Sequence, residues 1–274
     1  MNDIHVFCIE FKSTEILSSE SSLNQTKISF EHKIIQLVPG SFDSTVLVNS
    51  LSPDKSLHLS RINLENQTII DHLNIDSSIV NYHVRAFTSQ YIIGTSFDQE
   101  RNPDRYTVYV YDWQNDQPRL TFENTKLIDI SENAIRIVHP MIVGKHVQID
   151  LSSGQEIREP KENTSDIIPN QHPISYTQES EFFSWFQKLL KKFGFDPVVQ
   201  CEHLKWDNLH IVSFYEKDQN KLKNHLMILD NEGIKINSYL LAQNLKGIAV
   251  DTFFVKENKL IFVDDQNVLS ILYA

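Results

Sequence analysis

The chain has 274 residues, of which 41% are hydrophobic and 10% aromatic, so it can bury a core and is not disordered as a whole. Its formal net charge of −11 argues against a nucleic-acid partner, because phosphate binding needs a concentrated basic surface. Two cysteines, Cys8 and Cys201, are too few for a disulfide framework, and we expect both to be reduced thiols.

The N-terminal dozen residues lack the basic and continuous apolar regions of a secretory signal. Apolar runs elsewhere fall well short of the roughly 20 residues that span a bilayer. The sequence therefore predicts a soluble, cytoplasmic protein without a membrane span.

A strand–turn–strand unit recurs along the chain, with a polar turn in the same place each time. It begins at residues 57–70 and returns at 107–117, 146–157 and 225–236. Another apolar strand precedes each unit. These leading strands are expected at residues 45–49, 91–96, 134–138, 209–215 and 260–263, with a last strand at 268–273. Since the chain has only 7 glycines, Asn, Asp and Ser must form most turns.

Most leading strands follow one another at intervals of about 45 residues, which suits a four-stranded propeller blade. The sequence predicts an all-β, β-propeller-like fold of about five blades in a single domain, residues 1–274. Residues 5–11 would complete the blade that the C-terminal strand leaves unfinished, which removes an exposed sheet edge. A two-sheet β-sandwich or an irregular β-solenoid are the alternatives.

One longer interval contains a linker and helical insertion, residues 160–196, with an amphipathic helix near 177–193. Ser175 or Thr177 can cap its start, and Gly194 can end it. The expected apolar stripe consists of Phe182, Phe186, Leu189, Leu190 and Phe193.

Phe183 and Trp185 lie beside this stripe in the expected helix. They are the candidate partner-binding residues, because large apolar side chains outside the buried face can dock a partner. The alternative is that the helix simply covers the outside of the β-domain.

Several short segments resemble an uncharacterised bacterial family classed as a domain of unknown function. They read Leu-His-Ile-Val-Ser-Phe-Tyr at 209–215, Asn-His-Leu-Met-Ile-Leu-Asp at 224–230 and Gly-Ile-Ala-Val-Asp-Thr-Phe-Phe at 247–254. Residues 102–112 and 173–176 are also similar, whereas Ile35 stands where the family tends to have an aromatic residue. The resemblance implies a propeller-like β-fold and no particular activity.

Local catalytic motifs are missing from the sequence. It has no Gly-x-Ser-x-Gly elbow and no phosphate-binding glycine loop, and its 11 histidines are not spaced as metal-binding pairs. We therefore expect no cofactor and no metal, although a propeller active site can gather single residues from distant blades.

Candidate ligand-binding residues come from loops that would open at one end of the propeller channel. Asp98, Asn102 and Asp104 lie in a long polar loop and offer oxygen ligands to a hard cation, or simply form a solvated turn. Long charged loops on a rigid scaffold are where binding residues often lie.

Tyr215 and Asn224 flank a second long polar loop, expected at residues 216–223. Each can bridge backbone groups or contact a ligand. Asp251 falls within an apolar strand expected at 248–255, where it would line the channel or be a hydrogen-bonded structural residue.

The leading functional hypothesis is a non-catalytic binding or scaffold protein that uses the loop-rich face or the inserted helix. The alternative is a small-ligand-binding protein or hydrolase, with Asp98, Asp104 and Asp251 as acids or ligands.

Overall fold

The computed structural model describes residues 23–75, 82–97, 106–142, 144–157 and 169–273. In this part of the chain, five antiparallel sheets and one helix confirm the predicted all-β class with an inserted helix. The chain divides into two compact units, one of residues 30–170 and one that joins the N-terminal segment to residues 171–274.

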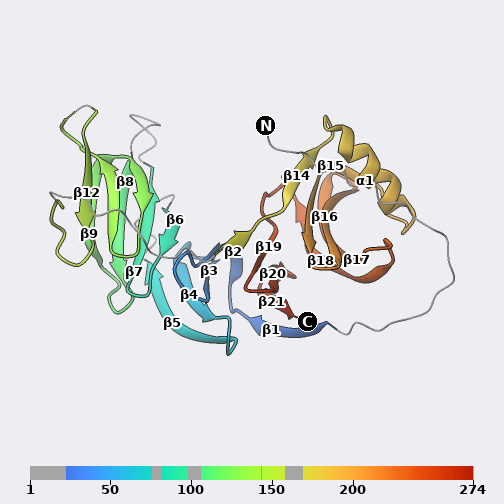
Figure 1. The fold of residues 1–274 in the computed structure, drawn as a ribbon, viewed down its shortest axis with the longest axis horizontal. Helices are drawn as coiled ribbons and strands as arrows, with labels where there is room; N and C mark the ends of the chain where they lie inside the picture. The colour runs from blue at the N-terminus through green and yellow to red at the C-terminus, as the bar shows by residue number, and fades with distance from the viewer. Residues whose placement is uncertain (1–22, 76–81, 98–105, 143, 158–168, 274) are drawn as a thin grey trace. The chain divides into compact units, whose positions relative to one another are not determined.

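The unit of residues 30–170 contains three sheets, each a meander of consecutive strands (Figure 1). The first consists of β2 (Lys33–Pro39), β3 (Thr45–Leu51), β4 (Leu57–Asn63) and β5 (Thr68–Ile75). The second consists of β6 (Tyr82–Phe87), β7 (Tyr91–Ser96), β8 (Tyr106–Asp112) and β9 (Pro118–Thr125). The third consists of β10 (Leu127–Ile130), β11 (Ala134–Val138) and β12 (His146–Asp150).

The other unit contains two five-stranded sheets. One runs in order through β14 (Ile174–Thr177), β15 (Pro197–Trp206), β16 (Leu209–Asp218), β17 (Lys221–Asp230) and β18 (Lys235–Leu245). The second has the order β1 (Asn24–Ser29), β21 (Val268–Tyr273), β20 (Lys259–Asp264), β19 (Phe253–Lys256) and β13 (Asn170–Gln171).

Both faces of the sheet β14–β18 are covered. One face packs against the second sheet, in a core that includes Ile211, Leu226, Phe253 and Phe262. Its other face is covered by α1 (Glu181–Lys191), which Figure 1 shows running alongside β15.

All the predicted leading strands are present. Their β-branched and aromatic residues favour extended backbone and are buried in the sheets. In β3 and β16, most consecutive residues are buried, which indicates sheets covered on both faces. Side chains of Asn and Asp form turns as predicted: Asp230 Oδ1 accepts the backbone N–H groups of Glu232 at 2.9 Å and Ile234 at 2.8 Å.

Three local predictions need correction. The strand that pairs with the C-terminal β21 is β1, Asn24–Ser29, whereas residues 5–11 lie outside the described residues. The long loop expected at 216–223 is a tight turn, because β16 continues to Asp218 and β17 begins at Lys221. The strand expected at 248–255 begins only at Phe253, since the preceding residues form a loop.

Candidate functional site

The candidate site is the loop of residues 246–252, together with the buried polar side chains of the β14–β18 sheet that hold it. We refer to this segment as the 246–252 loop. It follows β18 and leads into β19, so it connects the two sheets of its unit. Three of the residues singled out in the sequence, Tyr215, Asn224 and Asp251, meet here.

Glu202 of β15 is the centre of this network, and only 1% of its surface is exposed. Its Oε1 accepts the backbone N–H of Asp251 at 2.7 Å, and its Oε2 accepts that of Thr252 at 3.0 Å. The Thr252 hydroxyl donates to Oε2 at 2.5 Å, and the Ser175 hydroxyl donates to Oε1 at 3.3 Å. A buried carboxylate is stable only when donors such as these replace its bonds to water. Glu202 and the loop therefore fix each other's position.

Hydroxyl groups extend the network to the next strands of the sheet. Ser213 Oγ of β16 lies 2.8 Å from Thr252 Oγ1 and 3.0 Å from Asn224 Oδ1 of β17. Both Ser213 and Asn224 are buried. Asn224 therefore serves an internal network and is not open to a ligand.

Tyr215 anchors the middle of the loop. Its hydroxyl accepts the backbone N–H of Ala249 at 2.8 Å and donates to the Ala249 carbonyl oxygen at 3.2 Å. Gln200 Nε2 also donates to that carbonyl, at 3.3 Å. Burial raises the pKa of Tyr215, the bond to Ala249 lowers it, and the charge of Glu202 raises it further.

Asp251 is exposed and adopts a left-handed backbone conformation, with φ of 54°. This conformation is uncommon for a residue other than glycine. The carboxylate lies 3.5 Å from His172 Nδ1, and the backbone N–H is held by Glu202. The prediction that Asp251 lies within a strand is wrong, since the buried network turns the chain into a loop at this point.

Two apolar side chains project from the held loop. Ile248 is 43% exposed and Val250 is 66% exposed. Buried polar groups of the β14–β18 sheet thus fix the backbone of the loop, whereas these two apolar side chains are exposed.

The structure places the remaining sequence candidates elsewhere. Asp98, Asn102 and Asp104 lie outside the described residues. Sequence reasoning missed Glu202, because β15 also carries Gln200, His203 and Lys205, so no local pattern sets this acidic residue apart. In the described ranges, His, Cys, Asp and Glu form no group of three that could hold a metal ion.

The helix α1 carries the predicted partner-binding residues. Ser180 caps its start by accepting the N–H of Phe182, so the caps expected at Ser175 and Thr177 are wrong. The buried face also differs from the predicted stripe, because Phe183 is buried and Phe182 is 53% exposed. Phe183 therefore contributes to the core and not to a docking surface.

The true buried face of α1 follows from where the sheet lies. Phe183, Phe186, Leu189 and Leu190 contact the sheet cluster that contains Val212, Phe214 and Met227. The spacing of these four residues places them on one face of the helix. The stripe predicted from the sequence began with Phe182, whereas the buried face begins with Phe183.

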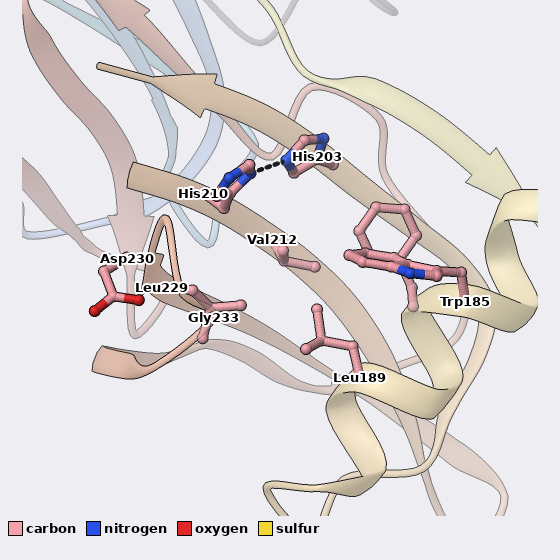
Figure 2. Close-up of a pocket in the computed structure, with 9 residues that line it drawn as sticks. Trp185, Leu189, His203, His210, Val212, Leu229, Asp230 and Gly233 are labelled. Carbon is pink, nitrogen blue, oxygen red and sulfur yellow. Dashed lines mark hydrogen bonds between the residues drawn. The ribbon is translucent and has the colours of Figure 1, made fainter. Parts of the chain in front are cut away.

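Trp185 is half-buried beside a small pocket between α1 and the sheet (Figure 2). Its ring meets that of Phe186 edge-on, with 5.0 Å between centroids. Figure 2 shows Trp185 and Leu189 extending from the helix toward the strands that carry His203, His210 and Val212. The pocket has room for about one water molecule.

His203 and His210 form a pair that lines this pocket. His203 Nε2 lies 3.0 Å from His210 Nδ1, and the rings are stacked with 5.2 Å between centroids. Burial, and then the neighbouring His210, lowers the pKa of His203 to about 4. Burial also lowers the pKa of His210, as does Lys205, against the opposing effect of Asp230.

None of the helices in the described part of the chain has both the length and the apolar character needed to cross a membrane. No family model matches the chain, and no curated protein is similar to it. A solved structure, the uncharacterized protein lmo1340 from Listeria monocytogenes EGD-e, is 12% identical, with a TM-score of 0.32. The match covers 85% of this chain and 61% of that one. Such a distant likeness leaves the function to be argued from the site itself.

Proposed function

We propose that this protein is a non-catalytic binding protein and that the 246–252 loop is a surface through which it contacts a protein partner. The observation that carries this proposal is the use of a buried carboxylate, Glu202, to fix the backbone of an exposed loop.

The energetics support a recognition role. Burying a carboxylate and holding Asp251 at a positive φ both oppose folding, by about 1–3 kcal/mol for the strained residue alone. The gain is a loop whose conformation is set before any partner arrives, which lowers the entropy cost of binding. The side chains that the fixed loop presents, Ile248 and Val250, are apolar.

A site-specific photo-crosslinking experiment tests the proposal. A benzophenone amino acid replaces Val250 in one variant and Lys235, an exposed residue of β18, in a matched control. Illumination in cells should give a discrete protein adduct from position 250 only. Adding Glu202→Gln should abolish the adduct while the protein stays folded. The absence of a position-specific adduct would contradict the proposal.

The alternative, a small-ligand-binding protein or hydrolase, is distinguished by thermal unfolding against metabolites, sugars, nucleotides and divalent cations. A ligand at about 100 times its dissociation constant stabilises the folded state by about 2.7 kcal/mol. A shift that Asp251→Asn abolishes would favour this alternative over protein binding.

We also infer that the sheets are blades of a β-propeller and that the protein is cytoplasmic. Support for the propeller comes from the meandering strand order within each sheet and from the pairing of β1 with the C-terminal β21. Support for a reducing compartment comes from the free thiol of buried Cys201. An experimental structure that showed the sheets in two stacked layers would exclude the propeller.

A further inference from the structure

A second surface, which borders the 246–252 loop at Asp251, lies where β14 and the start of α1 meet. β14 is the first strand of its sheet, and among the strands of the described residues it pairs only with β15. Edge strands of this kind present backbone N–H and C=O groups that can pair with another strand.

The register shows which backbone groups face outward. Gln178 N–H donates inward to the Val199 carbonyl oxygen at 3.1 Å, in continuation of the β14–β15 pairing. Since inward and outward groups alternate along an antiparallel strand, the N–H groups of Ser175 and Thr177 and the C=O of Ser175 point to the open side.

Apolar side chains accompany this edge on the α1 side of the sheet. Ile174 is 62% exposed, and its cross-strand neighbour is His203, whose ring lies 5.6 Å from that of Phe186. Phe182, 53% exposed, lies with its ring 5.7 Å from that of half-buried Tyr176. Ile174, Tyr176 and Phe182 therefore form an apolar row beside the open backbone groups.

The charges at the two ends of this edge are acidic. Exposed Glu179 and Glu181 lie at the end that leads into α1. At the other end, exposed Asp251 lies beside His172, two residues before the strand. With a net charge of −11, a second copy of the chain would bring more negative charge to this edge, whereas a basic segment would complement it.

We propose that β14 receives an extended segment of another protein, which adds as a further strand of the β14–β18 sheet. The occupant has apolar side chains at alternate positions, to cover Ile174 and Phe182, and a basic residue near each end. Backbone pairing supplies affinity in this mode, and the alternate side chains supply specificity. This inference rests on the open edge of β14, whereas the proposed function rests on the side chains of Ile248 and Val250, so the two experiments can fail independently.

Binding of a synthetic peptide to the full chain tests the proposal. The probe is a fluorescent peptide in which valine alternates with threonine between terminal lysines. We expect saturable binding, and slower amide hydrogen exchange at residues 175 and 177. Ile174→Asp should weaken binding about tenfold or more, whereas Ile234→Asp, at an exposed turn of the same unit, should leave it unchanged.

Two modified peptides separate strand addition from simple apolar contact. N-methylation of alternate backbone amides keeps every side chain but blocks pairing, so it should weaken binding about tenfold or more. Exchange of the terminal lysines for glutamates should also weaken it. Absence of peptide binding, or equal binding of the N-methylated peptide, would overturn the proposal. Sedimentation that showed a dimer lost in Ile174→Asp would assign the edge to a second copy instead.

Discussion

Glu202 and Thr252 are 50 residues apart in the chain, yet the Thr252 hydroxyl lies 2.5 Å from the Glu202 carboxylate. The same carboxylate accepts two successive backbone N–H groups, those of Asp251 and Thr252. One side chain therefore sets the conformation of the 246–252 loop. Its removal should change both the free energy of unfolding and the conformation of the loop.

Glu202→Gln should lower the free energy of unfolding by about 2–4 kcal/mol, because an amide NH₂ would face donors that now meet a carboxylate. Denaturant unfolding measures this change. Glu232→Gln, at an exposed turn, is the matched control and should stay within about 0.5 kcal/mol of the wild type. Equal effects of the two substitutions would mean that Glu202 does not hold the loop.

Tyr215→Phe should lower the free energy of unfolding by about 1–2 kcal/mol, since Ala249 loses its bonds to the hydroxyl. Amide hydrogen exchange of Ala249 should accelerate more than that of residues in β16. The control is Tyr273→Phe, in β21, whose hydroxyl is not part of this network. Unchanged exchange at Ala249 would contradict the anchoring role.

Phe183→Ala and Phe182→Ala compare two adjacent residues of the same type in α1, of which one is buried and the other is exposed. Phe183 is 3% exposed and should cost about 3–5 kcal/mol of stability, because truncation leaves a cavity under the helix. Phe182 is 53% exposed and should cost less than about 1 kcal/mol. The reverse order, measured by thermal or denaturant unfolding, would restore the stripe predicted from the sequence.

Stability should decline as the pH falls from about 6.5 toward 4. The folded state holds the pKa of His203 at about 4, below the ordinary value of 6.5 for histidine, so the unfolded chain binds more protons in this window. The contribution of His203 to the free energy of unfolding is fully present above the pKa of the unfolded state. It is lost as the pH falls to the pKa of the folded state. Because His203 is partly exposed, we expect about 2–3 kcal/mol for this residue.

The measurement is denaturant unfolding at several pH values, with His203→Gln and His146→Gln compared with the wild type. His203→Gln should reduce the loss of stability at low pH. The control substitution His146→Gln, at an exposed position in β12, should leave that loss unchanged. The same slope in both variants would assign the acid sensitivity to other groups.

Much of the fold could be predicted from the sequence, because strand formation depends on local patterns. The β-branched and aromatic runs of β3, β7, β11, β16 and β20 are buried where they were expected. Turns form at Asn and Asp, as the scarcity of glycine requires.

The candidate site depended on contacts that no local pattern contains. Tyr215, Asn224 and Asp251 could be chosen from the sequence as polar residues in apolar surroundings, but Glu202, which links them, lies on a different strand. β19 begins at Phe253, directly after the two residues whose N–H groups bind this carboxylate, and not at the start of the apolar run at 248–255.

By itself, then, the sequence determined the secondary-structure class, the positions of the leading strands and the presence of one amphipathic helix. Only the tertiary structure decided which face of α1 is buried, which segment pairs with the C-terminal strand and which carboxylate is enclosed. Periodicity is a property of neighbouring residues and can be read along the chain. Burial and hydrogen bonding depend on residues some 50 positions apart, which meet only when the sheets pack.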